Sequence, residues 1–227
     1  MNIDVAFDLT LEHGRCVGVK IPTDDGALDA FAEATLLPEE RAFAANLFIV
    51  RRRSWIGGRA AMRRALVLAG IEAPPILPDA RGAPGLPPGI AGSISHKERV
   101  AVALVAREKE MRVGVDVEAD EPGTVDISSK VIADDELAGL APLDPRERAR
   151  EVLLRFSAKE AIYKALDPFV HRFVNFKEVS VETHPDGRAD IRLHLDKSEG
   201  PFEVDVRWRR FDALVLTTAR VGRLHRS

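Results

Sequence analysis

Residues 151–167 have the pattern of a helix and place charged side chains among apolar ones. Charged groups at such positions could bind a metal ion or a phosphate. Residues 151–167 are rich in Ala, Leu, Lys and Glu and contain no Gly or Pro, which predicts a helix. At about 100° per residue, Lys159 and Glu160 fall inside its apolar arc, and Lys164 stands one turn after Glu160. The arc consists of Val152, Phe156, Tyr163 and Leu166, with Leu153 at its edge. Charges on a core-facing stripe are costly unless a metal or an anion compensates them. Taken alone, a solvated Glu–Lys pair remains the simpler interpretation.

A second acidic pair lies upstream on a predicted strand. Residues 112–118 alternate strictly, so that three valines face one way while Asp116 and Glu118 face the other. The two carboxylates are then roughly 6.6 Å apart along the strand, at about 3.3 Å per residue, and repel each other. A divalent cation removes that conflict, and ligands that are all oxygen point to Mg²⁺ or Mn²⁺. Solvated strand acids are the alternative interpretation.

Arginines near an apolar line mark a third segment. A helical pattern runs from Pro38 toward Gly70, and the pair Gly57-Gly58 is expected to weaken or break it midway. Residues 51–53 are all arginine, and on a helical wheel Arg52 and Arg59 lie close to the apolar line formed by Trp55, Met62 and Leu66. Their stems could simply cover apolar surface with the charged heads in water. As a cluster they favour anion binding, because a guanidinium fork suits phosphate.

A proline-rich loop precedes a further group of polar residues, called here the Ser-His corner. Residues 71–92 contain many Pro and Gly, which predicts a stiff loop in which Arg81 is the only basic residue. Ser95 and His96 follow, shortly before the buried-strand run of residues 100–106. Hydroxyls, a histidine and free amides at such a place can bind phosphate, but a turn with local hydrogen bonds explains the pattern equally well.

Composition narrows the class of protein. The 227 residues carry a net charge of −3 and 45% hydrophobic residues, enough for a real core and poorly suited to general nucleic-acid binding. The single cysteine excludes an internal disulfide and a cysteine metal cluster. No apolar run is long enough to span a bilayer and the first residues do not resemble a signal peptide, so a soluble cytoplasmic protein is expected.

The rest of the C-terminal half contains further predicted helices and a set of predicted strands, and the strands are expected to have a structural role. A short helix is expected to start at residues 134–137, and residues 146–155 form a charged helical lead into the first segment. After Pro168 the sequence alternates like strands at residues 176–182, 188–195, 202–208 and 213–219, which predicts an antiparallel meander packed on the helix.

Three of these segments together resemble one family. Residues 114–118 fit Gly-x-Asp-x-Glu, and residues 156–164 fit Phe/Trp-x-x-Lys-Glu-x-x-x-Lys about forty residues later. Residues 92–96 fit the upstream Ser-x-Ser-His motif. In this order they resemble the 4′-phosphopantetheinyl transferases of the long, monomeric class that activates surfactin and enterobactin synthetases, and the arginine helix is most similar to the enterobactin branch.

The resemblance implies a fold and an activity. It implies an α+β fold of two similar halves related by a pseudo-twofold axis, each a small, mainly antiparallel sheet packed with helices, with the active site in the cleft between them. Residues 1–112 would recognise the nucleotide of coenzyme A, and residues 113–227 would carry the metal site and catalytic helix. The reaction would be that of a holo-[acyl-carrier-protein] synthase, moving the phosphopantetheine arm of coenzyme A to a carrier-protein serine and releasing adenosine 3′,5′-bisphosphate.

The resemblance also implies residue roles. The metal, Mg²⁺ or Mn²⁺, would be held by Asp116, Glu118 and Glu160, with Asp116, Glu160 and Lys164 catalytic and Glu160 the base for the carrier serine. Coenzyme A would contact Arg51, Arg52, Arg59, Arg81, Ala83, Ser95, His96, Lys159 and Lys164. Relatives often have Gly-Lys-Pro where this chain has Arg81-Gly82-Ala83-Pro84, so the role of Arg81 stays open. Which of residues 51–53 reaches phosphate also stays open.

Two other classes of function are compatible with parts of the sequence. A non-catalytic protein that binds coenzyme A or a nucleotide would use the arginines of residues 51–59 and the pair Ser95-His96 of the Ser-His corner. Such a protein would have no need for the three carboxylates that are expected to bind a metal. A scaffold could use residues 51–64 and 146–155 to recognise acidic partners. The sequence does not distinguish fatty-acid, polyketide, nonribosomal-peptide and siderophore carriers.

Overall fold

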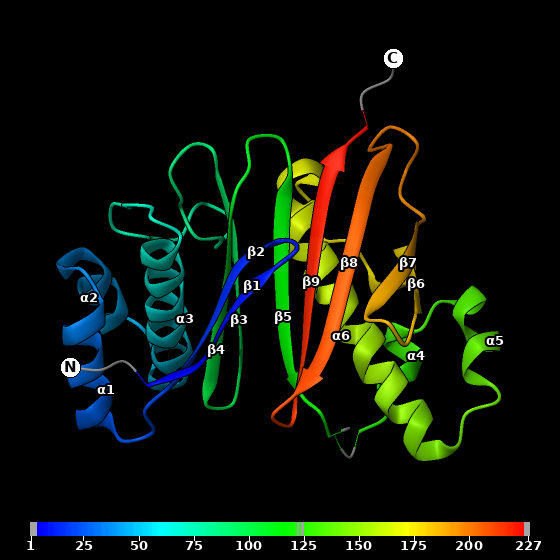
Figure 1. Ribbon diagram of the computed structural model, residues 1–227, viewed down its shortest axis with the longest axis horizontal. Helices are drawn as coiled ribbons and strands as arrows, with labels where there is room; N and C mark the ends of the chain where they lie inside the picture. Colours follow the sequence, from blue (N-terminus) through cyan, green and yellow to red (C-terminus); the bar gives the residue numbers. More distant parts are fainter. Residues whose placement is uncertain (1–3, 122, 124, 225–227) are drawn as a thin grey trace. The chain divides into compact units, whose positions relative to one another are not determined.

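The computed structural model describes residues 4–121, 123 and 125–224, and it has the predicted α+β class. The chain forms two compact units, Met1–Lys109 and Glu110–Ser227. The boundary predicted from sequence, after residue 112, lies three residues further on. Each unit packs one long helix on an antiparallel sheet (Figure 1). Among the described residues, no helix combines the length and the apolar character needed to cross a membrane.

The N-terminal unit has a four-stranded sheet in the order β1-β2-β4-β3. Its elements are β1 (Val5–Leu11), β2 (Gly14–Lys20), α1 (Asp25–Thr35), α2 (Pro38–Ala45), α3 (Ile49–Leu68), β3 (Ile90–Lys97) and β4 (Val100–Arg107). Residues 17–21 alternate in the way that is typical of a strand, and most of them lie in β2, whereas β1 and α1 have no such signal in the sequence analysis. The predicted loop of residues 71–92 is confirmed up to the start of β3. The core of the unit lies between α3 and the sheet.

The predicted break at Gly57-Gly58 is wrong. The helical stretch is interrupted earlier, between the end of α2 and the start of α3, and α3 continues through both glycines. A Cβ on Gly57 would lie 2.6 Å from Cγ1 of Ile21, and one on Gly58 would lie 2.7 Å from Cγ2 of Ile94. The glycines therefore let α3 approach the sheet closely, and the packing gained outweighs their roughly 1 kcal/mol propensity cost.

The C-terminal unit has a five-stranded sheet in the order β5-β9-β8-β7-β6. Its elements are β5 (Arg112–Ala119), α4 (Ser128–Val131), the 3₁₀ turn η1 (Asp134–Glu136), α5 (Leu137–Leu140), α6 (Pro145–Val170), the 3₁₀ turn η2 (Phe176–Glu178), β6 (Val179–Thr183), β7 (Arg188–Leu193), β8 (Phe202–Phe211) and β9 (Leu214–Arg223). The predicted meander, the helix start at residues 134–137 and the helix at residues 151–167 are confirmed. The meander also pairs with β5 through β9, so it fixes the strand that carries Asp116.

The long helix α6 crosses one face of this sheet (Figure 1). Its N-cap Asp144 accepts hydrogen bonds from the backbone of Arg146 and Glu147, and Pro145 occupies the first turn. Its core-facing side consists of Ala158, Ala161, Ile162, Ala165 and Leu166.

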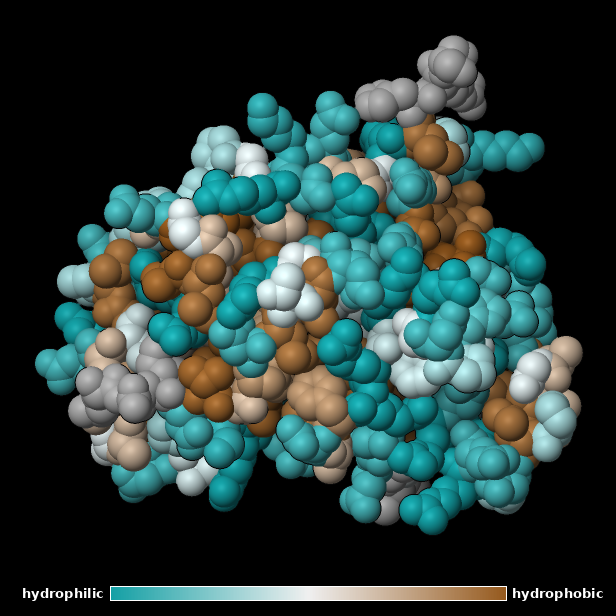
Figure 2. Space-filling view, viewed as in Figure 1, coloured by the Kyte–Doolittle hydropathy of each residue, from teal (hydrophilic) through white to brown (hydrophobic). Residues whose placement is uncertain are grey.

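On the face seen in Figure 2, hydrophilic residues predominate over the C-terminal unit, with a hydrophobic area over α5, where Leu137 is exposed.

Gly114 sets the distance between β5 and α6, which leads to a first prediction. A Cβ at this position would lie 1.8 Å from the backbone oxygen of Ala161, so no side chain fits. We expect Gly114→Ala to lower the free energy of unfolding by at least about 1–3 kcal/mol, the usual cost of overpacking, in urea denaturation. Gly139→Ala is the matched control, since its Cβ would meet only a guanidinium nitrogen of Arg155 at 3.4 Å. Equal stability of Gly114→Ala and Gly139→Ala would show that this contact does not hold the two elements.

Candidate active site

Asp116 is buried on β5 and held by two side chains of α6. The residue is only 4% exposed. Its Oδ1 accepts a hydrogen bond of 2.9 Å from Nζ of Lys164, and its Oδ2 accepts one of 2.8 Å from Oγ of Ser157. The Lys164 ammonium also donates to the backbone oxygen of Val115 at 2.9 Å. The strand and the helix that the sequence keeps about forty residues apart therefore meet at this carboxylate.

Glu160 lies in the same electrostatic environment. It precedes Lys164 by one helical turn and is half-buried. Burial is the main reason why the pKa of Glu160 is raised, and the negative charges of Asp116 and Glu118 raise it further, against the opposing effect of Lys164. Asp116 and Glu118 are thus close enough to Glu160 for their charges to act on its carboxyl group. A carboxyl with a raised pKa is also a stronger base than an ordinary glutamate.

The three acids are of the residue type that binds divalent cations. Their side chains, however, are not grouped as a complete ligand set in this structure. Within the described ranges, no three His, Cys, Asp or Glu side chains are grouped so as to hold a metal ion. Each carboxylate oxygen of Asp116 accepts a hydrogen bond, from Lys164 on Oδ1 and from Ser157 on Oδ2, and a carboxylate offers about four acceptor directions in all. Carboxylate oxygens are the ligands that Mg²⁺ prefers, and mutual repulsion among the acids is the conflict that a cation relieves.

Two hydroxyls in this site were not predicted from sequence. Ser157 and Thr217 are both fully buried, and their oxygens are 2.9 Å apart. Thr217 lies on β9 directly opposite Asp116 in the strand pairing, and its hydroxyl donates to the backbone oxygen of Ser157 at 2.9 Å. Ser157 lies within the helical motif, so its hydroxyl among apolar side chains is a signal from which it could have been predicted as a site residue. No local pattern links Thr217 to the motif.

The structure does not support the expected phosphate contact of Lys159. This side chain is 1% exposed, and its ammonium donates to Glu136 and, at 2.7 Å, to the backbone oxygen of Val131. Glu136 also accepts from the backbone of Ala133 and of Val181. Burial lowers the pKa of Lys159, and the partner carboxylate opposes that shift. Lys159 therefore ties α6 to η1 inside the protein, which is a structural role.

The three consecutive arginines of α3 differ in their partners. Arg52 forms an ion pair with Asp29, and Arg53 pairs with Asp25 at 2.6 Å. Arg51 is exposed, and among the described residues its guanidinium has no ion pair or hydrogen bond. Of the three, Arg51 is the one most available to an anion.

Arg59 is a packing residue in this structure. It is 5% exposed, its Nε donates to the backbone oxygen of Ile76 at 2.6 Å, and its guanidinium carbon lies 4.8 Å from the ring centroid of Trp55. Burial lowers the pKa of Arg59 to about 10, against the opposing charge of Glu40. It thus stays charged at neutral pH while anchoring the proline-rich loop to α3. A direct phosphate contact through this buried side chain is not supported.

The other expected nucleotide contacts lie on the loop and on β3. Asp79 Oδ1 accepts from the backbone N–H of Arg81 at 2.8 Å and of Ala83 at 2.9 Å, which fixes a tight turn. On β3, Ser95 is buried and His96 is exposed. Their contact with a nucleotide stays a prediction.

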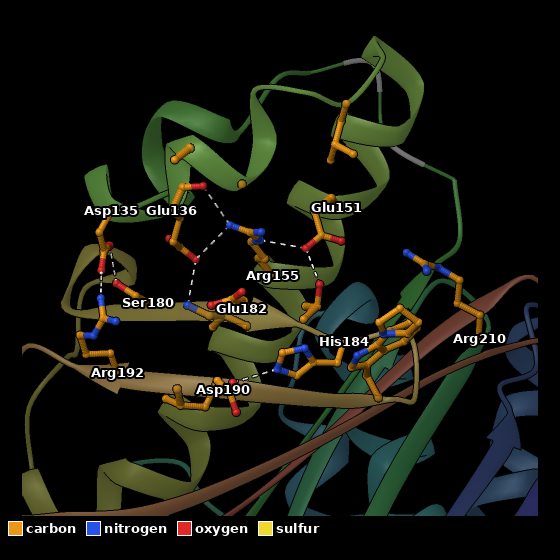
Figure 3. A pocket seen from close by; sticks show the side chains of 18 residues that line it. Asp135, Glu136, Glu151, Arg155, Ser180, Glu182, His184, Asp190, Arg192 and Arg210 are labelled. Carbon is orange, nitrogen blue, oxygen red and sulfur yellow. Dashed lines mark hydrogen bonds and ion pairs between the residues drawn. The ribbon is translucent and has the colours of Figure 1, made fainter.

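A separate hollow of about 830 Å³ lies in the C-terminal unit beside α5, α6 and strands β6 to β8 (Figure 3). None of the predicted site residues lines it. Several of its acids are already paired, for example Asp135 with Arg192 and Glu151 with Arg155.

The comparisons with known proteins agree on one family. The family model of the 4′-phosphopantetheinyl transferase N-terminal domain matches residues 39–106, and that of the 4′-phosphopantetheinyl transferase superfamily matches residues 112–219. The 4′-phosphopantetheinyl transferase Svp of Streptomyces mobaraensis is 33% identical over 202 residues, covering 82% of this chain and 79% of the relative. The chain belongs to the 4′-phosphopantetheinyl transferase family.

Two further relatives of this family of transferases differ in how much they cover. The transferase PptT of Mycobacterium tuberculosis is 32% identical, over 81% of this chain and 85% of its own length. Enterobactin synthase component D of Salmonella typhimurium is 36% identical over 118 residues, which is 51% of this chain and 48% of the relative. The predicted family, and with it the assignment as an enzyme, is therefore confirmed. The superfamily match contains Asp116, Glu118, Glu160 and Lys164.

Proposed function

We propose that this protein transfers the phosphopantetheine arm of coenzyme A to a serine of an acyl or peptidyl carrier protein and releases adenosine 3′,5′-bisphosphate. The observation that supports this most is the buried Asp116, clamped by the lysine one turn after Glu160. Two carboxylates and an ammonium therefore lie in one electrostatic environment, which suits the negative charge of a diphosphate. Phosphoryl transfer depends mainly on such positioning and electrostatic stabilisation.

Glu160 would act as the general base. The carrier serine oxygen forms a bond to the phosphorus on the pantetheine side of the diphosphate, and the bond from that phosphorus to the bridging oxygen breaks. The serine proton passes to the Glu160 carboxylate, whose raised pKa suits it to accept a proton. The leaving group departs as a phosphate of adenosine 3′,5′-bisphosphate. The Lys164 ammonium would balance the negative charge on the leaving oxygen.

Asp116, Glu118 and Glu160 would hold a divalent cation, Mg²⁺ or Mn²⁺. Such an ion supplies Lewis-acid charge stabilisation to the diphosphate oxygens. Their carboxylate chemistry and mutual repulsion fit this ion. The bonds from Ser157 and Lys164 orient Asp116 before any ion binds.

The nucleotide end of coenzyme A would be recognised by the N-terminal unit. Arg51 offers an exposed guanidinium, and His96 and Ser95 on β3 offer further polar groups for the 3′-phosphate. Arg81 and Ala83 would contact the adenine from their fixed turn. The chain would act as a monomer.

The proposed function is tested by loading a panel of apo carrier proteins with coenzyme A and Mg²⁺ and measuring their masses. We expect at least one carrier to gain a single phosphopantetheine arm, and a chelator to prevent the gain. The alternative, a coenzyme A-binding protein without catalysis, predicts a coenzyme A-dependent rise in melting temperature but no mass gain on any carrier. That second result would overturn the proposal.

Arg51 gives a sharper test of how coenzyme A binds. If it contacts the 3′-phosphate, Arg51→Ala should raise the KM for coenzyme A by about 10- to 100-fold, the loss expected for a hydrogen bond to a charged group. The KM for 3′-dephospho-coenzyme A should barely change, because that substrate lacks the phosphate. Arg53→Ala removes the same charge from an arginine that already has a partner and serves as the control. Equal loss for both substrates would rule out this role for Arg51.

A further inference from the structure

Asp116 is surrounded by a set of hydroxyls that its proposed role does not by itself explain. Thr217 stands directly opposite Asp116 in the pairing of β9 with β5, so both side chains lie on the same face of the sheet. Ser157 of α6 lies over that face and contacts both: its Oγ is 2.8 Å from Asp116 Oδ2 and 2.9 Å from Thr217 Oγ1. Ser157 therefore links both strands to the helix, with Asp116 Oδ2 on one side and Thr217 Oγ1 on the other.

The direction of these hydrogen bonds follows from counting protons. Two hydroxyls supply two protons, while three contacts are present. An ionised carboxylate only accepts, so the Ser157 proton points to Asp116. The Thr217 proton then points to Ser157, towards its backbone oxygen at 2.9 Å and its Oγ at the same distance. The order of donation is Thr217 to Ser157 to Asp116.

Two buried hydroxyls at a helix–sheet contact depend on their hydrogen bonds. Both hydroxyls are fully buried, and a buried hydroxyl costs free energy unless its hydrogen bonds are made. Alanine and valine would pack the same place without polar groups, as they do at Ala161, Ala165 and Val221 in the same core. What the two hydroxyls add is a fixed orientation for Asp116, with a proton donor on one oxygen while Lys164 donates to the other.

We propose that Ser157 and Thr217 are positioning residues that hold the Asp116 carboxylate in the orientation needed to bind the divalent cation. This inference rests on the proposed function, because it takes Asp116 as a ligand. The hydroxyls do not touch the cation or the substrate. They act through Asp116, as outer hydrogen-bond partners act on ligating carboxylates in metal sites, where their loss costs about 10- to 100-fold in affinity or activity.

The experiment measures the affinity of the protein alone for Mn²⁺, by electron paramagnetic resonance, together with the Mg²⁺ concentration for half-maximal carrier loading. Thr217→Val keeps the shape of the side chain and removes the hydroxyl, whereas Thr217→Ser keeps the hydroxyl. Ser157→Ala removes the second donor. Ser180→Ala is the matched control, because Ser180 is also buried and donates to an aspartate, Asp135, at 2.6 Å in the same unit.

We expect Thr217→Val and Ser157→Ala to weaken Mn²⁺ binding by about 10-fold or more and to raise the Mg²⁺ requirement in parallel. Thr217→Ser and Ser180→Ala should stay close to the wild type, and the KM for coenzyme A at saturating Mg²⁺ should be unchanged. The inference is overturned if Thr217→Val lowers the melting temperature but leaves the Mn²⁺ affinity unchanged, since the hydroxyls would then be structural only. A wild-type protein that shows this affinity pattern but loads no carrier would support the inference and refute the proposed function.

Discussion

Replacing Glu160 with glutamine should reduce carrier loading by at least about a hundredfold, the usual contribution of a general base. The substitution keeps the size of the side chain but removes the group that accepts the serine proton and one proposed ligand of the cation. The initial rate of phosphopantetheine transfer, measured by mass spectrometry at saturating coenzyme A, checks this. Glu203→Gln, an exposed acid on β8, is the control and should retain the wild-type rate. Transfer by Glu160→Gln at the wild-type rate would remove Glu160 from the chemistry.

The same substitution should not destabilise the fold. The pKa of Glu160 is raised in the folded protein, chiefly by burial and further by the repulsion from Asp116 and Glu118. The folded state therefore binds this proton more tightly than the unfolded state, and the contribution of Glu160 to stability is lost as the pH rises through the folded pKa. Glutamine carries no charge, so urea denaturation at neutral pH should give Glu160→Gln a stability equal to or above that of the wild type. Activity and stability then change independently.

Replacing Lys159 with methionine should have the opposite effect, a large loss of stability. The change leaves the Glu136 carboxylate buried without its ammonium partner, and breaking a buried ion pair from one side costs about 3–5 kcal/mol. Methionine keeps most of the apolar volume, so the loss reports on charge and hydrogen bonding. Urea denaturation measures it, with Lys177→Met, an exposed lysine, as the control.

The double variant Lys159→Met/Glu136→Gln should cost less than the sum of the two single changes, because the second change removes the buried charge that has lost its ammonium partner and keeps only the more distant Arg155, at 3.9 Å. Protein that remains folded after Lys159→Met should still bind coenzyme A with the wild-type KM. A stable Lys159→Met protein with a sharply raised KM would instead restore Lys159 as a phosphate contact.

The spacing of charged residues predicted which of them share a face, and the structure brings Lys164 into contact with Asp116, while the metal site there stays a prediction. Alternation on a strand fixes which side of β5 Asp116 and Glu118 take, and helical period aligns Glu160 with Lys164. Gly114 could be recognised as part of a motif, but its reason, the approach of Ala161, is a contact between distant segments. Sequence spacing can therefore show that residues share a face, while the structure shows what they meet there.

The two lysines of α6 show where this reasoning ends. Lys159 and Lys164 both fall near the apolar arc, yet one reaches Glu136 in the interior and the other reaches Asp116. The difference depends on which segment packs against each turn of the helix. Glu136 lies on a short 3₁₀ turn, and no periodicity in the sequence relates its position to that of Lys159. Thr217 was missed for the same reason. The helix α3 was predicted to break at its glycines because propensity is local, whereas the compensating contacts with Ile21 and Ile94 are not.

The proposed chemistry depends on Asp116, Glu118 and Glu160 acting together on one divalent cation. The most direct measurement is a Mn²⁺ titration followed by electron paramagnetic resonance, with coenzyme A present, on the wild type and on Asp116→Asn, Glu118→Gln and Glu160→Gln. We predict that the wild type binds Mn²⁺ and that its Mn²⁺ affinity falls by about 10-fold or more in each variant, as expected when one ligand is removed from a coordination sphere. Unchanged Mn²⁺ affinity and stoichiometry in all three variants would contradict the assignment.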